Sequence, residues 1–377
     1  MVAAVAKIEN AGTVRESGPG SGRPSRRSII AALLAFLLAT PGVAQAAAAA
    51  VFDAKTLFPA FGFDNAARRS AERGEIVGVE GPSSMETELT GAAAMRVSAP
   101  PAEIARRLRD GLVVLADRRI VAWAKIDTEV AGEPWTRAAF TGGDRAEVAL
   151  LYSAEPGDTF NLSAAELAFL RTRLGGTTPD DAAAVPLASA AYREILIGRH
   201  RAYRNRGQDG LADYARDAGN SSPAEELRQV GASGQVPPPL RGLLRGLQGF
   251  PGALPAGIES RFFWKKSLVD DRPIFVLSQV LVEERPDAVL FALREYYPGH
   301  SYNVLQQLGA VVPVEDGSLI LAVNSTVTDR VGGALGPVAR VIGRGRALDA
   351  LRDYFAHMRE VIGETRPERT ETADHSR

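Results

Sequence analysis

The stretch from Ile258 to Ile362 constrains the fold of this chain most, because it reads as consecutive strands followed by one long amphipathic helix. Five of its segments are rich in β-branched and aromatic residues, which favour a pleated strand. They are Ile258–Leu268, Ile274–Val282, Ala288–Tyr297, Ser301–Val314 and Ser318–Thr328. The last segment alternates apolar residues with Asn324, Thr326 and Thr328, as expected of a strand with one polar face.

Short turn signals separate these segments. Asp270-Asp271, Pro298-Gly299 and Asp316-Gly317 are dipeptides that favour tight turns, and the last is a strong hairpin signal. One segment has two readings, because Arg285–Tyr297 also fits a helix that begins at Pro286. We favour the strand, and the sequence therefore predicts an antiparallel sheet.

A helix is predicted to follow the strands. Leu348, Leu351, Phe355, Met358 and Ile362 are spaced by three and four residues and form one apolar stripe. Glycines upstream of this stripe predict a bend, or close packing on the sheet. We therefore predict an α+β fold in which an antiparallel sheet packs on a long C-terminal helix.

The N-terminus resembles an export signal. Ile29–Ala44 contains a short apolar run, and Ala44-Gln45-Ala46 is a small-x-small cleavage site. The run is too short for a comfortable membrane span, so no stable span is expected after its removal. Arg26-Arg27 resembles the twin-arginine signal, although a general secretory signal can also contain two arginines. We predict a periplasmic or secreted protein.

Composition excludes several kinds of site. The chain of 377 residues contains no cysteine, so it has no disulfide, thiol nucleophile or Cys metal site. Its four histidines lack metal-ligand spacing, and neither a metal nor another cofactor is expected. The net charge is −1, and removing residues 1–46 takes away five basic and two acidic residues, which leaves −4. A mildly acidic chain argues against nucleic-acid binding.

The remaining segments suggest one elaborated domain. We predict a linker and docking segment at 47–90, a single α+β domain at 91–362 with a helical insertion at 182–249, and a disordered tail at 363–377. Glu75–Glu80 and Gly91–Ser98 read as strands, Pro101–Asp110 as a helix and Leu112–Ile126 as further strand. Ser163 opens a capping box, and Gly210–Arg216 is expected to form a short helix in a region without strands.

Candidate ligand-binding residues gather near the turn at Pro298-Gly299. Arg294, Tyr297, His300 and Tyr302 place an imidazole, phenols and a guanidinium close together. Histidine titrates near neutral pH, so His300 could act as a general acid or base. The simpler interpretation is a turn histidine with a satisfied hydrogen bond.

Two further features allow ligand contact. Asn324 lies on the polar face of the last strand, which meets water in a flat sheet and lines a cavity if the sheet curls. The basic run Arg199–Arg206 could contact anionic head groups at a membrane surface, although a basic helix end in solvent is the simpler reading.

The segment Ala94–Asp110, together with the downstream strands and the Gly-interrupted helix, resembles the helix-grip proteins of the START and polyketide-cyclase superfamily. That resemblance implies a sheet wrapped around a C-terminal helix, with an apolar ligand cavity between them. The chain from Gly91 to Arg359 is also similar to a group of exported bacterial proteins with no assigned function. Arg201–Arg204, Tyr297–Tyr302 and Asn324–Asp329 carry this second resemblance, which implies no activity.

These observations lead to three functional hypotheses. The first is an exported binder or carrier of a lipid or other apolar small molecule. The second is a periplasmic enzyme in which His300 works with Tyr297 or Tyr302. The third is an envelope protein with a structural or interaction role.

Overall fold

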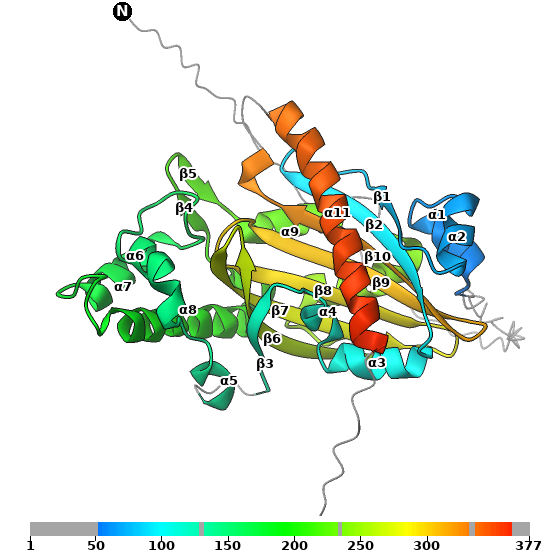
Figure 1. The fold of residues 1–377 in the computed structure, drawn as a ribbon, viewed down its shortest axis with the longest axis horizontal. Coiled ribbons are helices and arrows are strands. Elements are labelled where there is room, and N and C mark those ends of the chain that lie inside the picture. Colours follow the sequence, from blue (N-terminus) through cyan, green and yellow to red (C-terminus); the bar gives the residue numbers. More distant parts are fainter. Residues whose placement is uncertain (1–51, 128–131, 233–235, 332–335, 364–377) are drawn as a thin grey trace, which may run out of the picture. The chain divides into compact units, whose positions relative to one another are not determined.

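The fold was analysed in a computed structural model of the chain (Figure 1). The structure describes residues 52–127, 132–232, 236–331 and 336–363. The predicted export segment and residues 364–377 of the predicted tail lie outside the described residues. The described residues all belong to one compact unit, and all that follows concerns this unit.

A large antiparallel sheet of eight strands forms the centre of the fold, which confirms the predicted α+β class. The strand order is β1-β2-β10-β9-β8-β7-β6-β3. The strands are β1 (Val77–Glu80), β2 (Glu88–Val97), β3 (Ile120–Lys125), β6 (Ile258–Val269), β7 (Arg272–Glu284), β8 (Val289–Pro298), β9 (Val304–Val314) and β10 (Gly317–Val327). Both edge strands, β1 and β3, are short, which limits the unpaired backbone that could recruit another chain.

The five C-terminal strands form a meander, because β6 to β10 pair in sequence order. Asp270 and Asp271 both have positive φ, as does Asp316 with Gly317, so these pairs form the tight turns that the sequence predicts. The segment Arg285–Tyr297, which fits both a strand and a helix, contains strand β8. All ten residues of β8 are buried between layers, whereas a helix with one apolar face would leave about half of them exposed. The prediction of a strand is confirmed.

Helices cover both faces of the sheet. They are α1 (Ala54–Ala60), α2 (Asn65–Glu72), α3 (Pro101–Arg109), α4 (Leu112–Leu115), α5 (Glu133–Thr136), α6 (Arg145–Tyr152), α7 (Ala164–Leu174), α8 (Ala184–Arg206), α9 (Pro223–Ala232), α10 (Arg241–Gly249) and α11 (Gly336–Gly363). Short 3-10 turns lie at Gly142–Asp144, Gly207–Gly210, Pro238–Leu240 and Asp329–Val331. The predicted capping box at Ser163 begins α7.

One local prediction is half right and another is wrong. Within the predicted strand Leu112–Ile126, Ile120–Lys125 is strand β3, but Leu112–Leu115 is helix α4, which begins after Gly111 with its positive φ. The expected short helix at Gly210–Arg216 is instead the first strand of a small hairpin, in which β4 (Tyr214–Arg216) pairs with β5 (Gly219–Ser221). The polar residues of this hairpin give too short a pattern to distinguish from a loop.

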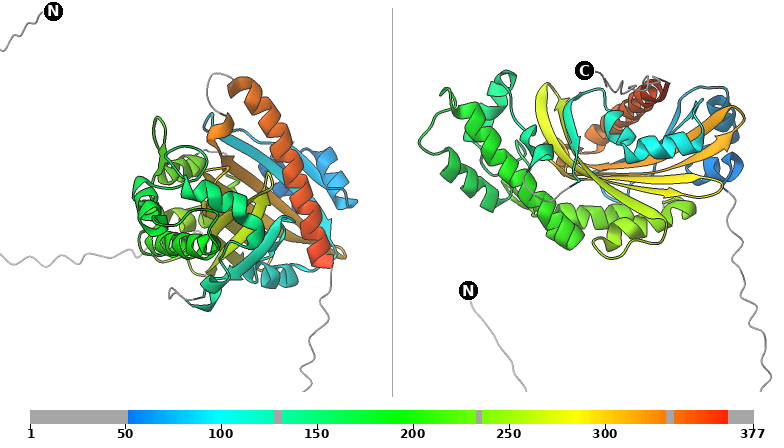
Figure 2. Two further views of the ribbon diagram at one scale, coloured as in Figure 1. Left: turned by 60° about the vertical axis from the view of Figure 1, so that its left-hand side comes forward. Right: turned by 90° about the horizontal axis from the view of Figure 1, so that it is seen from below.

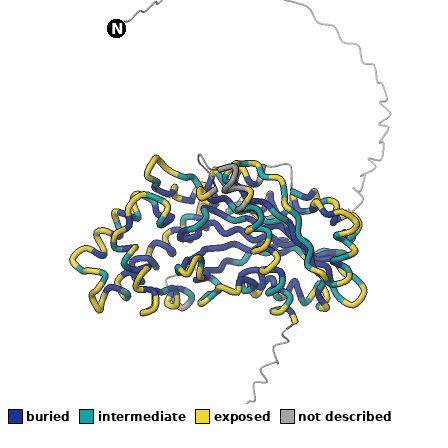
Figure 3. The backbone as a smooth tube through the Cα atoms, turned by 45° about the horizontal axis from the view of Figure 1, so that its top comes forward, coloured by how far each residue is buried: buried dark blue, intermediate teal, exposed yellow. Residues whose placement is uncertain are grey.

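Side chains of neighbouring strand residues point to opposite faces of the sheet, and each face has its own core. On one face, α3, α4 and α11 bury Phe291, Val311 and Ile320, together with Phe355 of α11. The other face packs against α1, α8 and α10, among others. The right-hand view of Figure 2 shows α11 and α3 on one side of the sheet and the long helix α8 on the other. The sheet is therefore the buried middle layer (Figure 3).

Candidate functional site

A cavity of about 250 Å³ lies on the face of the sheet that α11 covers. Strand residues of one parity line it, such as Leu293 and Glu295 of β8 and Leu305 and Gln307 of β9. The other lining residues are Leu89, Val113, Asp117, Arg119, Lys265, Ser267, Val269, Ile274, Val276, Tyr302, Asn324, Thr326, Ala347, Ala350, Leu351 and Tyr354. The cavity is thus a gap in the layer between the sheet and the helix, with both apolar and polar walls.

Lys265 is the centre of a buried ionic cluster in this cavity. Its Nζ lies 2.7 Å from Oε1 of Glu295 and 3.5 Å from Oδ2 of Asp117, and all three side chains are buried. The Asp117 carboxylate also accepts a hydrogen bond from the Arg119 side chain, whose Nε lies 2.8 Å from Oδ1 of Asp117. The four charged groups that line the cavity are therefore two cations and two anions, which are paired with one another.

Local structure places these charges. Lys265 follows Phe263 by two residues on β6, so its side chain shares the face that α11 covers, whereas Lys266 points to the other face and pairs with Asp144. Asp117 follows α4 and accepts a backbone hydrogen bond from Arg119, which fixes the turn that leads into β3.

Two phenols complete the polar wall. The Tyr302 hydroxyl donates to Oε2 of Glu295 at 2.5 Å, so both oxygens of this carboxylate have a partner. The Tyr354 hydroxyl donates to the carbonyl oxygen of Val113 at 2.8 Å and joins α11 to α4. Burial, followed by the nearby Glu295, raises the pKa of both phenols well above the usual value, so both stay protonated.

The pKa values of Asp117 and Lys265 show how opposite charges in the cluster offset the effect of burial. Burial alone would raise the pKa of Asp117, but Lys265 and Arg119 outweigh it and lower this pKa to about 2. Burial opposes the charge of Lys265 as well, and Glu295 and Asp117 nevertheless raise its pKa. At neutral pH the Lys265 amine is therefore an ammonium ion and a poor nucleophile.

The structure separates the five predicted site residues. Tyr302 and Asn324 line the cavity, and Asn324 donates from Nδ2 to the Thr326 hydroxyl at 3.1 Å. Arg294, Tyr297 and His300 are not among the lining residues. They are buried elsewhere, with contacts that join the sheet to its neighbours.

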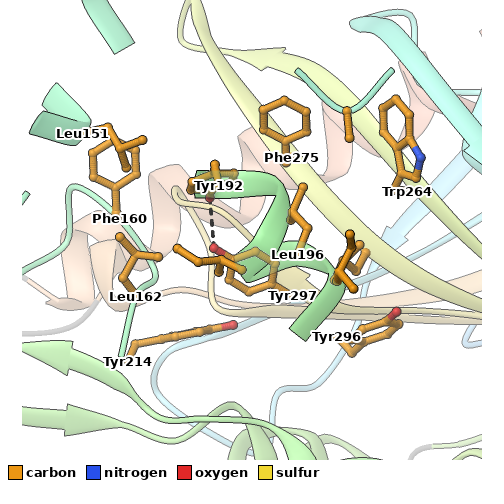
Figure 4. Packing of buried hydrophobic residues seen from close by; sticks show 14 of the residues in the cluster. Leu151, Phe160, Leu162, Tyr192, Leu196, Tyr214, Trp264, Phe275, Tyr296 and Tyr297 are labelled. Atoms are coloured by element: carbon orange, nitrogen blue, oxygen red, sulfur yellow. Dashed lines mark hydrogen bonds between the residues drawn. The ribbon is translucent and has the colours of Figure 1, made fainter. Parts of the chain in front are cut away.

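Tyr297 belongs to an aromatic cluster on the opposite face of the sheet. Its hydroxyl bonds that of Tyr192 on α8 at 2.9 Å, as the dashed line in Figure 4 shows. The Arg199 guanidinium lies 4.2 Å from the centre of the Tyr297 ring and pairs with Glu166 at 2.6 Å. The basic run of α8 is therefore not simply solvated, since Arg199 and His200 are buried.

Arg294 is fully buried and binds neutral oxygen atoms. Its Nη1 donates to the carbonyl oxygen of Leu247 near the C-terminus of α10 at 2.8 Å, and its Nη2 donates to Oε1 of Gln306 at 2.8 Å. With the Gln208 amide turned to satisfy both groups, its oxygen also accepts from Nη1 at 2.7 Å. Arg294 thus connects β8 with β9 and α10.

His300 has the satisfied contacts of a turn residue. Its Nδ1 lies 2.5 Å from the Ser301 hydroxyl, and its Nε2 lies 3.2 Å from the carbonyl oxygen of Pro273. Burial, followed by the positive charge of Arg272, lowers its pKa to about 4, so it is neutral at pH 7. The adjacent Ser301 has a φ of 72°, and Asn161 braces this turn by donating to the carbonyl oxygens of Pro298 and Tyr302.

Sequence reasoning missed Lys265, Glu295 and Asp117, the ionic centre of the cavity. A signal was present, because Lys265 and Lys266 directly follow the aromatic run Phe262–Trp264 in a predicted strand. A buried lysine requires an acidic partner. The identity of that partner depends on strand register and on the turn before β3, which the sequence does not encode locally.

Comparison of the sequence with protein-family models and with curated proteins gives no match. Within the described ranges, no helix combines the length and apolar character that crossing a membrane requires. The same part of the chain holds no group of three or more His, Cys, Asp or Glu side chains placed to bind a metal ion.

Proposed function

We propose that the chain is an exported protein that binds or carries an apolar or amphipathic small molecule in the cavity under α11. The observation that carries this proposal is the cavity itself, which lies between the sheet and the helix and is lined by ten aliphatic residues and ten polar, charged or phenolic ones. Ligand sites commonly have this mixed lining. In this proposal, the sheet and α11 hold the ligand in the manner of a helix-grip protein.

The cavity volume limits the size of the ligand. A cavity of about 150 Å³ accommodates benzene. By the same proportion, about 250 Å³ holds a ligand of about ten non-hydrogen atoms. We therefore favour a compact ligand, or the end of a longer one whose chain leaves the cavity beside the exposed Ala350.

Binding is better supported than catalysis by His300. This imidazole is only 1% exposed and is not among the cavity-lining residues. Asp117 and Lys265, which do line the cavity, are paired, and their shifted pKa values keep both charged near neutral pH, whereas a general acid or base must exchange its proton near the working pH. The structural hypothesis for His300 therefore has the stronger support.

Filling the cavity tests the proposal. Ala347 on α11 lines the cavity, and an Ala347→Phe substitution would place a ring the size of benzene inside it. The matched control is Ala356→Phe, nine residues further along the same helix and outside the cavity lining. The full chain and both variants are titrated by calorimetry with octan-1-ol, octanoate and octylamine, each of about nine or ten non-hydrogen atoms.

We expect at least one of these probes to bind the full chain, and Ala347→Phe to weaken its binding about tenfold or more while Ala356→Phe changes it little. Thermal unfolding of each variant verifies that the helix still packs on the sheet. The proposal is wrong if none of the three probes binds at millimolar concentration, or if both variants retain full affinity.

A further inference from the structure

We propose that the cavity under α11 selects an uncharged ligand that carries a hydroxyl or carbonyl group, and that it rejects carboxylates and ammonium ions. This inference rests on the proposed function and specifies the chemical class of the ligand. It follows from how the four charged side chains at the cavity are paired.

The positive groups are already occupied. The ammonium of Lys265 contacts Glu295 at 2.7 Å and Asp117 at 3.5 Å, and Arg119 holds the other oxygen of Asp117. A ligand carboxylate beside Lys265 would be a third anion next to Glu295 and Asp117, and if it displaced Glu295, that carboxylate would lie buried with no cation beside it. Removing one partner from a buried ion pair is strongly unfavourable.

The negative groups are occupied in the same way. Glu295 accepts from Lys265 through one oxygen and from Tyr302 through the other. Asp117 accepts from Arg119 and, at 3.3 Å, from the Ser267 hydroxyl. An ammonium ligand would therefore have to displace a cation or a hydroxyl, and it would leave the cavity with an uncompensated positive charge.

Neutral polar groups remain for recognition. Gln307, Asn324 and Thr326 line the same cavity, and their amide and hydroxyl groups can donate or accept hydrogen bonds. An alcohol or a carbonyl compound can bond these groups and place its apolar part against Leu293, Leu305 and their neighbours. Such a ligand satisfies the polar wall without adding charge to it.

The experiment compares the same three probes, which share a carbon chain and differ in charge. We expect octan-1-ol to bind the full chain about tenfold or more tightly than octanoate or octylamine at pH 7. In Glu295→Gln, Lys265 loses its nearest anion, and octanoate should gain about tenfold relative to octan-1-ol. Glu360→Gln is the control, since this exposed carboxylate of α11 lies outside the cavity lining, and it should change neither affinity.

A second variant covers the case in which Glu295→Gln does not fold. Thr326→Lys adds a cation at a half-buried position of the cavity wall and leaves the Lys265 cluster intact, so octanoate should again gain. The inference is overturned if octanoate or octylamine binds the full chain as tightly as octan-1-ol and Ala347→Phe weakens that binding. It is also overturned if the folded variants leave the preference unchanged. In both cases the binding function itself stands, whereas absence of binding by all three probes defeats that function.

Discussion

Acidification from pH 7 to pH 4 should destabilise this protein through His300, and the structure sets the size of the effect. Burial and the charges of Arg272 and Arg330 lower the pKa of His300 from 6.5 to about 4, although the Pro273 carbonyl and Asp270 oppose them. The nearby Glu147, 3.8 Å away, is itself paired with Arg272.

The direction of the effect follows from proton binding. Between pH 6.5 and pH 4 the unfolded chain takes up a proton at this imidazole and the folded chain resists it, so stability falls as the pH falls. At 1.36 kcal/mol for each pH unit between the two values, the loss at pH 4 is about 3 kcal/mol. This is a large share of the ~5–15 kcal/mol that stabilises a typical folded protein.

The assay is urea unfolding of the full chain and of His300→Gln at pH 7 and pH 4, with extrapolation to water. The substitution has its own cost in packing, which is the same at both pH values and cancels. We expect the variant to lose about 3 kcal/mol less than the unmodified chain on acidification. His200→Gln should behave alike, because burial lowers that pKa to about 4 as well. Equal losses in the variant and the unmodified chain would refute the reasoning.

Two further predictions concern buried polar groups. Burial, together with Asp329, raises the pKa of Glu226 to about 7, so on acidification the folded chain takes up this proton before the unfolded chain does. Between pH 7 and pH 4, the free energy of unfolding of the unmodified chain should therefore rise by about 3 kcal/mol relative to that of Glu226→Gln in the same urea assay. Arg294→Met leaves acceptors at Leu247 and Gln306 without their donor, so we expect a loss of about 2–5 kcal/mol in urea unfolding, with octan-1-ol affinity within about twofold of the unmodified chain. If a folded Arg294→Met protein bound octan-1-ol more weakly, Arg294 would instead have a role in ligand binding.

The strands that were predicted correctly carry local signals. Asp270-Asp271 and Asp316-Gly317 adopt positive φ at little cost, so these dipeptides mark the tight turns of the meander from local sequence alone. The hairpin that begins at Tyr214 was missed because its strands have three residues each, which is too short for alternation to emerge. Leu112–Leu115 was misread since a four-residue apolar run fits a strand and a helix equally well.

The candidate site was predicted only in part, for a different reason. Asn324 was found because alternation along one strand reveals which residues share a face. The partners of Lys265 lie about 150 residues upstream and 30 residues downstream in the sequence, so their contact depends on which strands are neighbours. His300 and Arg294 were predicted as functional residues because of their chemistry. The sequence alone does not distinguish a buried polar residue with satisfied hydrogen bonds from a catalytic one.

The order of strands in the sheet also dictates an order of assembly. The meander closes through short turns, whereas β2 pairs with β10 across about 220 residues, since Val97 lies opposite Ser318. Closing so long a loop costs more chain entropy than closing a hairpin, and pairings of this kind slow folding. During translation β2 is synthesised well before β10, so the N-terminal half of the nascent chain has an unpaired strand until β10 is synthesised. Completion of the sheet is thus a late event, and β2 exposes an unpaired strand edge until β10 has been made.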